Sequence, residues 1–93
     1  MEIINKRYMK RKVNPALKER MVDRSTIWGN PFKIKGSTIA ERRSVITLYE
    51  KYILAKYSSE YIYSKLNGWN LVCWCAPLPC HADVLRKICE RKK

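Results

Sequence analysis

The chain has 93 residues, a length typical of one domain, here residues 1–93, with a core of modest size. Its apolar fraction of 46%, including 11% aromatic residues, excludes a disordered chain. No apolar run reaches the length needed to cross a membrane, and the N-terminus has no signal-peptide pattern. We therefore expect a cytoplasmic protein with reduced cysteines and no membrane partner.

Charge is the strongest feature of the composition. Lys and Arg number 20 against 8 Asp and Glu, which gives a net charge of +12. Such an excess repels itself in the folded state and usually serves a polyanionic or acidic partner. The alternative is a basic surface that only keeps the protein in solution. Charge alone does not separate a nucleic acid from a nucleotide or an acidic protein.

The N-terminal part begins with Ile3-Ile4, which predicts a short opening strand. A basic segment, residues 6–12, follows, and a block of like charge is most often a solvated loop. Tyr8 and Met9 interrupt the segment, so an arm that contacts the phosphates of a nucleic acid is the alternative. Its five cationic residues are Lys6, Arg7, Lys10, Arg11 and Lys12. Residues 16–20 then predict a helical turn, and Met21-Val22 a second short strand.

The stretch Trp28-Gly29-Asn30-Pro31-Phe32 has a composition that predicts a shaped loop. Two interpretations of its aromatic rings stay open. In the first, Trp28 and Phe32 fill one end of the core. In the second, Trp28 stacks on a base and Asn30 hydrogen-bonds to the edge of that base.

Two helices are predicted after this loop. Thr38 and Glu41 have the spacing of a capping box, which starts a helix that runs to about Tyr57. Its apolar stripe consists of Val45, Leu48, Tyr49, Tyr52 and Ile53. A second helix is expected over residues 61–66, where Asn67-Gly68 would end it.

Residues 71–75 form a short apolar run that predicts a buried strand. Side chains alternate along a strand, so Cys73 and Cys75 share one face and Trp74 lies on the other. Pro77 and Pro79 then stop the strand. A helix is predicted to begin near Cys80-His81, with Asp83 in its first turn.

The cysteines and the histidine around this turn allow three interpretations. Zinc is the first, with Cys73, Cys75, Cys80 and His81 as ligands, although their spacing is not that of a standard site. The second is an activated Cys80 thiolate at the helix start, beside His81. In the third, Cys73 and Cys75 are small buried hydrophobic residues.

Taken together, the elements predict an α/β or α+β fold in which a short sheet packs against two or three helices. Arg24 and Arg43 would hold phosphate together with the helix start at residues 80–83, which includes Asp83. We expect the tryptophan loop and the cysteine–histidine turn to meet in one cationic recess, where Trp28 and Asn30 contact the ligand.

Several of these strings also occur together in one family. The residues are Ile3 to Arg7, Arg24, Trp28 to Phe32, Arg43 to Ile46 with Tyr49, Leu66 with Gly68, and residues 71–85. With them the chain resembles the uncharacterised bacterial and phage family called domain of unknown function 4326. The resemblance implies a phage, prophage or mobile-element context and brings no established reaction.

Three functional hypotheses follow. The first is a small basic protein that binds a phosphate-bearing ligand, with nucleic acid ahead of a free nucleotide. The second is an enzyme in which Cys80 or His81 acts on a nucleotide or nucleobase. The third is an inhibitor that docks on an acidic host protein, such as a nuclease or a polymerase.

Overall fold

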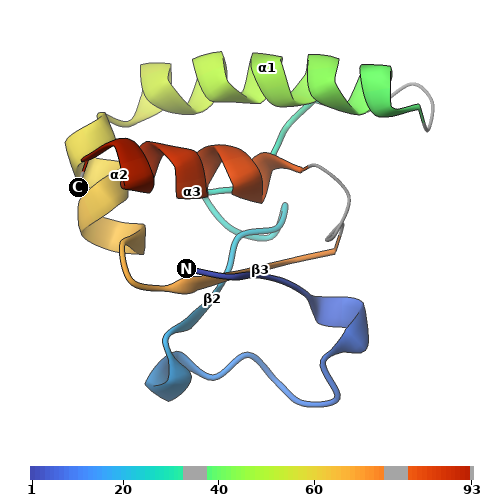
Figure 1. The fold of residues 1–93 in the computed structure, drawn as a ribbon, viewed down its shortest axis with the longest axis vertical. Helices are drawn as coiled ribbons and strands as arrows, with labels where there is room; N and C mark the ends of the chain where they lie inside the picture. Colours follow the sequence, from blue (N-terminus) through green and yellow to red (C-terminus); the bar gives the residue numbers. More distant parts are fainter. Residues whose placement is uncertain (33–37, 75–79, 93) are drawn as a thin grey trace.

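The computed structural model describes residues 1–32, 38–74 and 80–92, in which three parallel strands carry three α-helices on one side (Figure 1). Two short 3-10 helices lie on the other side of the sheet. This architecture confirms the expected small α+β fold. The elements are β1 (Ile3–Asn5), η1 (Lys6–Tyr8), η2 (Pro15–Leu17), β2 (Glu19–Met21), α1 (Ile39–Lys56), α2 (Ser59–Leu66), β3 (Asn70–Cys73) and α3 (His81–Lys92).

The last strand in the chain, β3, lies in the middle of the sheet, in the order β1-β3-β2. Leu71 pairs with Ile3 of β1 and with Arg20 of β2. Leu71, Val72 and Cys73 are all buried, as expected for a parallel strand that is covered on both faces. The apolar run of the sequence is therefore explained by the central position of this strand.

The segment before β2 differs from the prediction in its boundaries. The helical turn covers Pro15–Leu17 instead of residues 16–20, and the strand covers Glu19–Met21 instead of residues 21–22. Lys18 adopts a left-handed conformation, with φ of 58°, which ends the turn and lets the chain extend at once. Beyond β2, the Val22 N–H still donates to the Val72 carbonyl at 2.9 Å.

Side-chain caps define the starts of the first two α-helices. The Thr38 hydroxyl accepts from the Glu41 N–H at 3.2 Å, so the Thr38 half of the predicted capping box is confirmed. The Ser58 hydroxyl accepts from the Tyr61 N–H at 3.1 Å, which starts α2 two residues earlier than expected. Gly68, with φ of 84°, then turns the chain toward β3.

The apolar stripe of α1 is narrower than predicted. Tyr49 and Ile53 are completely buried, whereas Leu48 keeps 45% of its surface exposed. The burial of Leu48 was therefore a wrong prediction. α1 lies at the outside of the helical layer, so only the side turned to the rest of the molecule is covered (Figure 1).

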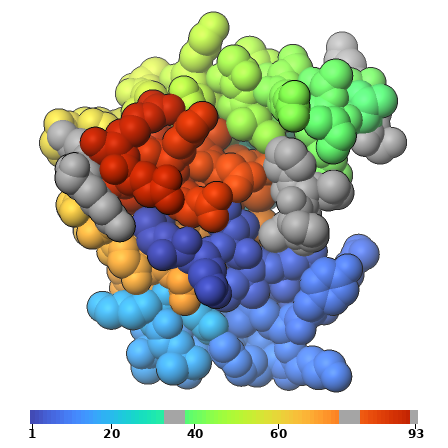
Figure 2. All heavy atoms as spheres, viewed as in Figure 1, coloured from blue at the N-terminus to red at the C-terminus, as the bar shows by residue number. Residues whose placement is uncertain are grey.

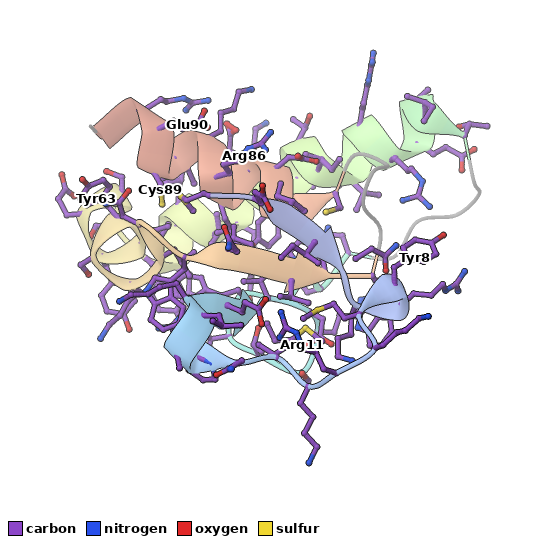
Figure 3. All side chains as sticks on the ribbon, turned by 60° about the horizontal axis from the view of Figure 1, so that its bottom comes forward. Tyr8, Arg11, Tyr63, Arg86, Cys89 and Glu90 are labelled. Carbon is purple, nitrogen blue, oxygen red and sulfur yellow. The ribbon has the colours of Figure 1, made fainter. Side chains whose placement is uncertain are left out.

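α3 lies directly over the sheet and beside β1 (Figures 1 and 2). Its inner face carries Leu85, Ile88 and Cys89, which join the core. Arg86 and Glu90 point away from the sheet and form an ion pair at 3.8 Å (Figure 3). Within the described parts of the chain, no helix combines the length and hydrophobicity that crossing a bilayer requires.

Candidate functional site

A cavity of about 390 Å³ lies where β2 and β3 end, beside the start of α3. Asp23 and Arg24 follow β2, Trp74 follows β3, and all three line the cavity. The carboxyl ends of parallel strands are the usual position of ligand sites in open α/β sheets. Cys80 and His81 line it too, so the predicted meeting of the two distant segments takes place.

The loop before α1 is folded tightly against the end of β2. The Thr26 N–H donates to the Asp23 carbonyl at 3.0 Å, and the Gly29 N–H donates to the Thr26 carbonyl at 3.1 Å. A Cβ at Gly29 would lie 2.5 Å from the Cα of Arg24, which is closer than any side chain tolerates. Glycine therefore lets this loop bring Asn30 next to Arg24, where both line the cavity.

Trp28 does not line the cavity, because its indole is buried in the core with 3% of its surface exposed. Its ring lies 5.5 Å from that of Tyr57 and 6.4 Å from that of Tyr61, between centroids. The Tyr49 hydroxyl donates to the Trp28 carbonyl at 2.7 Å, and burial raises the pKa of Tyr49 far above its usual value. Base stacking on Trp28 was a wrong prediction, since the core covers its faces.

Asn30 does line the cavity, although half of its amide is already in use. Its Oδ1 accepts from the Phe32 N–H at 2.9 Å, which holds the turn. The part of the chain that the structure describes provides no acceptor for its Nδ2. Asn30 Nδ2 can therefore donate hydrogen bonds to a ligand, while Oδ1 keeps one lone pair beyond its bond with Phe32.

Trp74 is an exposed aromatic residue that lines the cavity, with 53% of its surface accessible. Its Nε1 donates to Asp23 Oδ2 at 2.9 Å, and Asp23 Oδ1 accepts from the Ser25 N–H at 3.0 Å and from the Ser25 hydroxyl. Partial burial acts to raise the pKa of Asp23, but the hydrogen bonds from Ser25 and Trp74 and the nearby His81 outweigh it and lower the pKa. Asp23 is thus a carboxylate that orients the indole.

His81 joins the start of α3 to the end of β2. Its Nε2 donates to the Val22 carbonyl, and its ring meets the Tyr49 ring edge-on at 5.2 Å. A carbonyl only accepts hydrogen bonds, so Nε2 carries the proton and a neutral His81 has its lone pair on Nδ1. His81 therefore has a structural role, and Nδ1 is the atom with which it could act on a ligand.

Asp83 caps α3 instead of lining the cavity. Its Oδ2 accepts from the Cys80 N–H at 2.9 Å, and the Asp83 N–H donates to the Cys80 carbonyl at 3.0 Å. The predicted contact of Asp83 with a ligand in this cavity was therefore wrong. The Asp83 carboxylate occupies the N–H of Cys80 and adds its own negative charge to this helix start, which disfavours a second anion there.

The cysteines near the cavity are buried. Cys73 and Cys80 bring their Sγ atoms to 3.5 Å. Cys75 lies outside the described residues, and within the remainder no three His, Cys, Asp or Glu side chains gather as metal ligands. Zinc binding by Cys73, Cys75, Cys80 and His81 therefore stays a prediction.

Two arginines line the cavity from different elements, Arg24 after β2 and Arg42 on α1. Arg43 is exposed and does not line the cavity, so the structure corrects the predicted residue by one position. One residue along a helix rotates a side chain by about 100°. The spacing of Arg42 from Val45 and Tyr49 in the apolar stripe was the signal that pointed to this arginine.

The basic segment lies on the other side of the sheet from the helices, as the position of Arg11 shows (Figure 3). Both terminal nitrogens of Arg11 donate to Glu19, each at 2.6 Å, and the Asn14 N–H donates to Glu19 Oε1 at 3.0 Å. The side-chain hydrogen bonds from Arg11 are the main cause, and the backbone hydrogen bond from Asn14 is the second, of a pKa of Glu19 lowered to about 2.

Arg11 therefore has a structural partner, which the predicted nucleic-acid contact did not anticipate. A guanidinium that is engaged by both oxygens of a carboxylate has few donors left for a phosphate. The other predicted contacts with nucleic acid stay predictions, namely Lys6, Arg7, Lys10 and Lys12.

Comparison with known proteins gives one curated relative and one family. The relative is an uncharacterised 12.4 kDa protein in the nrdA-td intergenic region of Enterobacteria phage T4, 32% identical over 74 residues. This match covers 75% of the chain and 66% of the relative, slightly less than two thirds of its length. No solved structure matches the chain significantly. The family match covers residues 4–91, so the chain belongs to the family described as Domain of unknown function (DUF4326).

Proposed function

We propose that this protein binds a phosphate-bearing ligand and places one nucleotide of it in the cavity at the ends of β2 and β3. The observation that carries the proposal is that two arginines and an exposed indole line the same cavity. Its volume of about 390 Å³ is within the range of small-molecule sites. The nucleotide belongs to a nucleic acid or is free.

The charges in the cavity favour an anion. Arg24 and Arg42 each bring a planar guanidinium, a group that can donate two parallel hydrogen bonds to phosphate. Asp23 is the carboxylate among the lining residues, and its oxygens already accept hydrogen bonds from Trp74 and Ser25. The site therefore keeps a net positive charge.

The apolar lining favours a flat ring beside that anion. Trp74 is held by its bond to Asp23 and exposes its indole, while Phe32, Val45 and Ile46 supply an apolar wall. An aromatic platform of this kind stacks on any base, because every base has a π-face. Asn30 Nδ2 can then donate to an acceptor on the base edge.

The test compares a nucleoside 5′-monophosphate with the same nucleoside without phosphate, by calorimetry or by quenching of tryptophan fluorescence. We expect the monophosphate to bind more tightly, and Arg42→Ala to weaken it by about tenfold or more. Arg43→Ala is the matched control, because it removes the same charge from the next position of α1. No binding of the monophosphate, or equal losses in both variants, would overturn the proposal.

Catalysis is the second candidate, because Cys80 and His81 line the same cavity as the arginines. Turnover would need His81 Nδ1 as a base or the Cys80 thiol as a nucleophile. Incubation of wild-type protein and the variants Cys80→Ser and His81→Ala with a panel of nucleotides, followed by mass spectrometry, tests this. A product that the wild type forms and at least one variant does not supports it, whereas no product, or the same product from all three proteins, rejects it.

A further inference from the structure

A second hollow adjoins the cavity on the far side of Arg24 and Asn30. Its volume of about 370 Å³ is close to that of the first, and Arg24 and Asn30 line both hollows. Tyr52 and Lys56 from α1 line only the second. A group bound at Arg24 is therefore within reach of two spaces, each with room for a ring.

We infer that the ligand contains a phosphodiester, with its phosphate at Arg24 and one nucleoside in each hollow. The inference rests on the proposed function, because it takes the first hollow as a nucleotide site. It names the ligand class as a dinucleotide or a longer single strand, in which a phosphate joins two rings. A mononucleotide would leave the second hollow without an occupant.

The position of Arg24 suits a bridging phosphate. Its backbone is held by the close approach of Gly29, and its side chain is exposed. The contact of its Nη2 with the Phe32 carbonyl, at 3.4 Å, is long for a hydrogen bond. The guanidinium therefore keeps most of its donors for a ligand that passes between the hollows.

The second hollow offers the same two kinds of group as the first, an aromatic ring and a cation. Lys56 Nζ lies 3.2 Å from the Tyr52 hydroxyl and 5.6 Å from the centroid of its ring. The hydrogen bond with Tyr52 raises the pKa of Lys56, so the amine is charged at neutral pH. Lys56 can thus attract the next phosphate of a strand, while the Tyr52 side chain contacts the second nucleoside.

The experiment measures dissociation constants for a 5′-phosphorylated mononucleotide, dinucleotide and tetranucleotide of one base. We expect the dinucleotide to bind about tenfold more tightly than the mononucleotide, since its second nucleoside contacts Tyr52 and its additional phosphate reaches Lys56. Lys56→Ala should remove most of this gain and leave the affinity for the mononucleotide unchanged. Lys65→Ala removes the same charge from α2, outside both hollows, and should change neither value.

The outcomes separate this inference from the proposed function. Equal affinity for mononucleotide and dinucleotide overturns the inference and leaves the nucleotide site standing, whereas no binding of any of the three overturns both. A loss in Lys56→Ala that is the same for mononucleotide and dinucleotide also rejects a second subsite. If the dinucleotide gain is present, a tetranucleotide of equal affinity identifies a dinucleotide ligand, and a tighter one identifies single-stranded nucleic acid.

Discussion

Two regions around the sheet use positive charge in different ways. On the side without α-helices, Arg11 binds a buried glutamate through two hydrogen bonds. At the ends of β2 and β3, Arg24 and Arg42 line a cavity and form no ion pair within the described residues. A cation with a buried carboxylate beside it stabilises the fold, and one without such a partner is available to a ligand. The net charge of +12 does not distinguish these roles.

A similar contrast holds for two tryptophans. Trp28 is buried in the core beside Tyr57 and Tyr61, whereas Trp74 is exposed at the cavity. Trp74 lines the proposed nucleotide site and Trp28 does not, so their surroundings separate a contact residue from a core residue. The predictions below test this division of roles, first for the tryptophans and then for the cations.

The largest expected effect is that of Trp28→Ala. Removing a buried indole should lower the free energy of unfolding by about 3–5 kcal/mol, which is a large share of the stability of a small domain. Urea unfolding followed by circular dichroism measures it. Trp28→Phe should lose clearly less, because it keeps an aromatic ring in the core. A stability equal to wild type for Trp28→Ala would place the indole at the surface.

Trp74→Ala should have the opposite pattern. Stacking on an aromatic ring contributes about 1–3 kcal/mol per base, so nucleotide binding should weaken by roughly tenfold while stability changes little. Trp74→Phe keeps a ring but loses the hydrogen bond to Asp23, and we expect intermediate affinity. Calorimetric titration of both variants checks this, and unchanged affinity in Trp74→Ala would reject the stacking role.

Glu19 predicts how stability depends on acid. Its pKa is lowered from 4.5 to about 2 by Arg11 and Asn14, so the folded state favours the ionised form. The resulting stability is fully present above pH 4.5 and is lost as the pH falls toward 2. Unfolding in urea at a series of pH values measures this loss.

Glu19→Gln is the control for this pH dependence. The variant should be less stable than wild type at neutral pH, because it loses the charged pair with Arg11. The difference between variant and wild type should shrink as the pH falls below 4.5. A difference that stays constant down to pH 2 would show that this pair does not set the acid response.

The smallest effect concerns the basic segment itself. If Lys10 contacts a phosphate, Lys10→Ala should reduce the slope of log affinity against log salt by about one for single-stranded nucleic acid. Arg11→Ala should instead lower the melting temperature by a few degrees, because it leaves Glu19 buried without its main partner. A change of slope in neither variant would assign the segment to the fold alone.

Much of the fold was predictable because its signals are local. The Thr38 hydroxyl caps the helix that begins next to it, and Gly68 turns the chain directly after α2. The apolar run at residues 71–73 marks a buried strand wherever that strand lies in the sheet. Each of these features depends on residues within a few positions along the chain, which can be read directly from the sequence.

The candidate site was predictable only in part, because its contacts join distant residues. Trp74 and Asp23 are 51 positions apart, and His81 and Val22 are 59 apart. The sequence indicated that Arg24, Asn30, Cys80 and His81 belong to one recess, but it did not show which tryptophan faces that recess. It also chose Arg43 where the structure uses Arg42.

By itself, the sequence determined the order of strands and helices, the excess of positive charge and the family to which the chain belongs. Only the tertiary structure decided which cations are free, which indole is buried and which cysteines meet. The reason is physical. Secondary-structure propensity and capping act over a turn of helix or a few residues of strand. Burial and charge pairing depend on which surfaces come together when helices and strands pack in the folded protein.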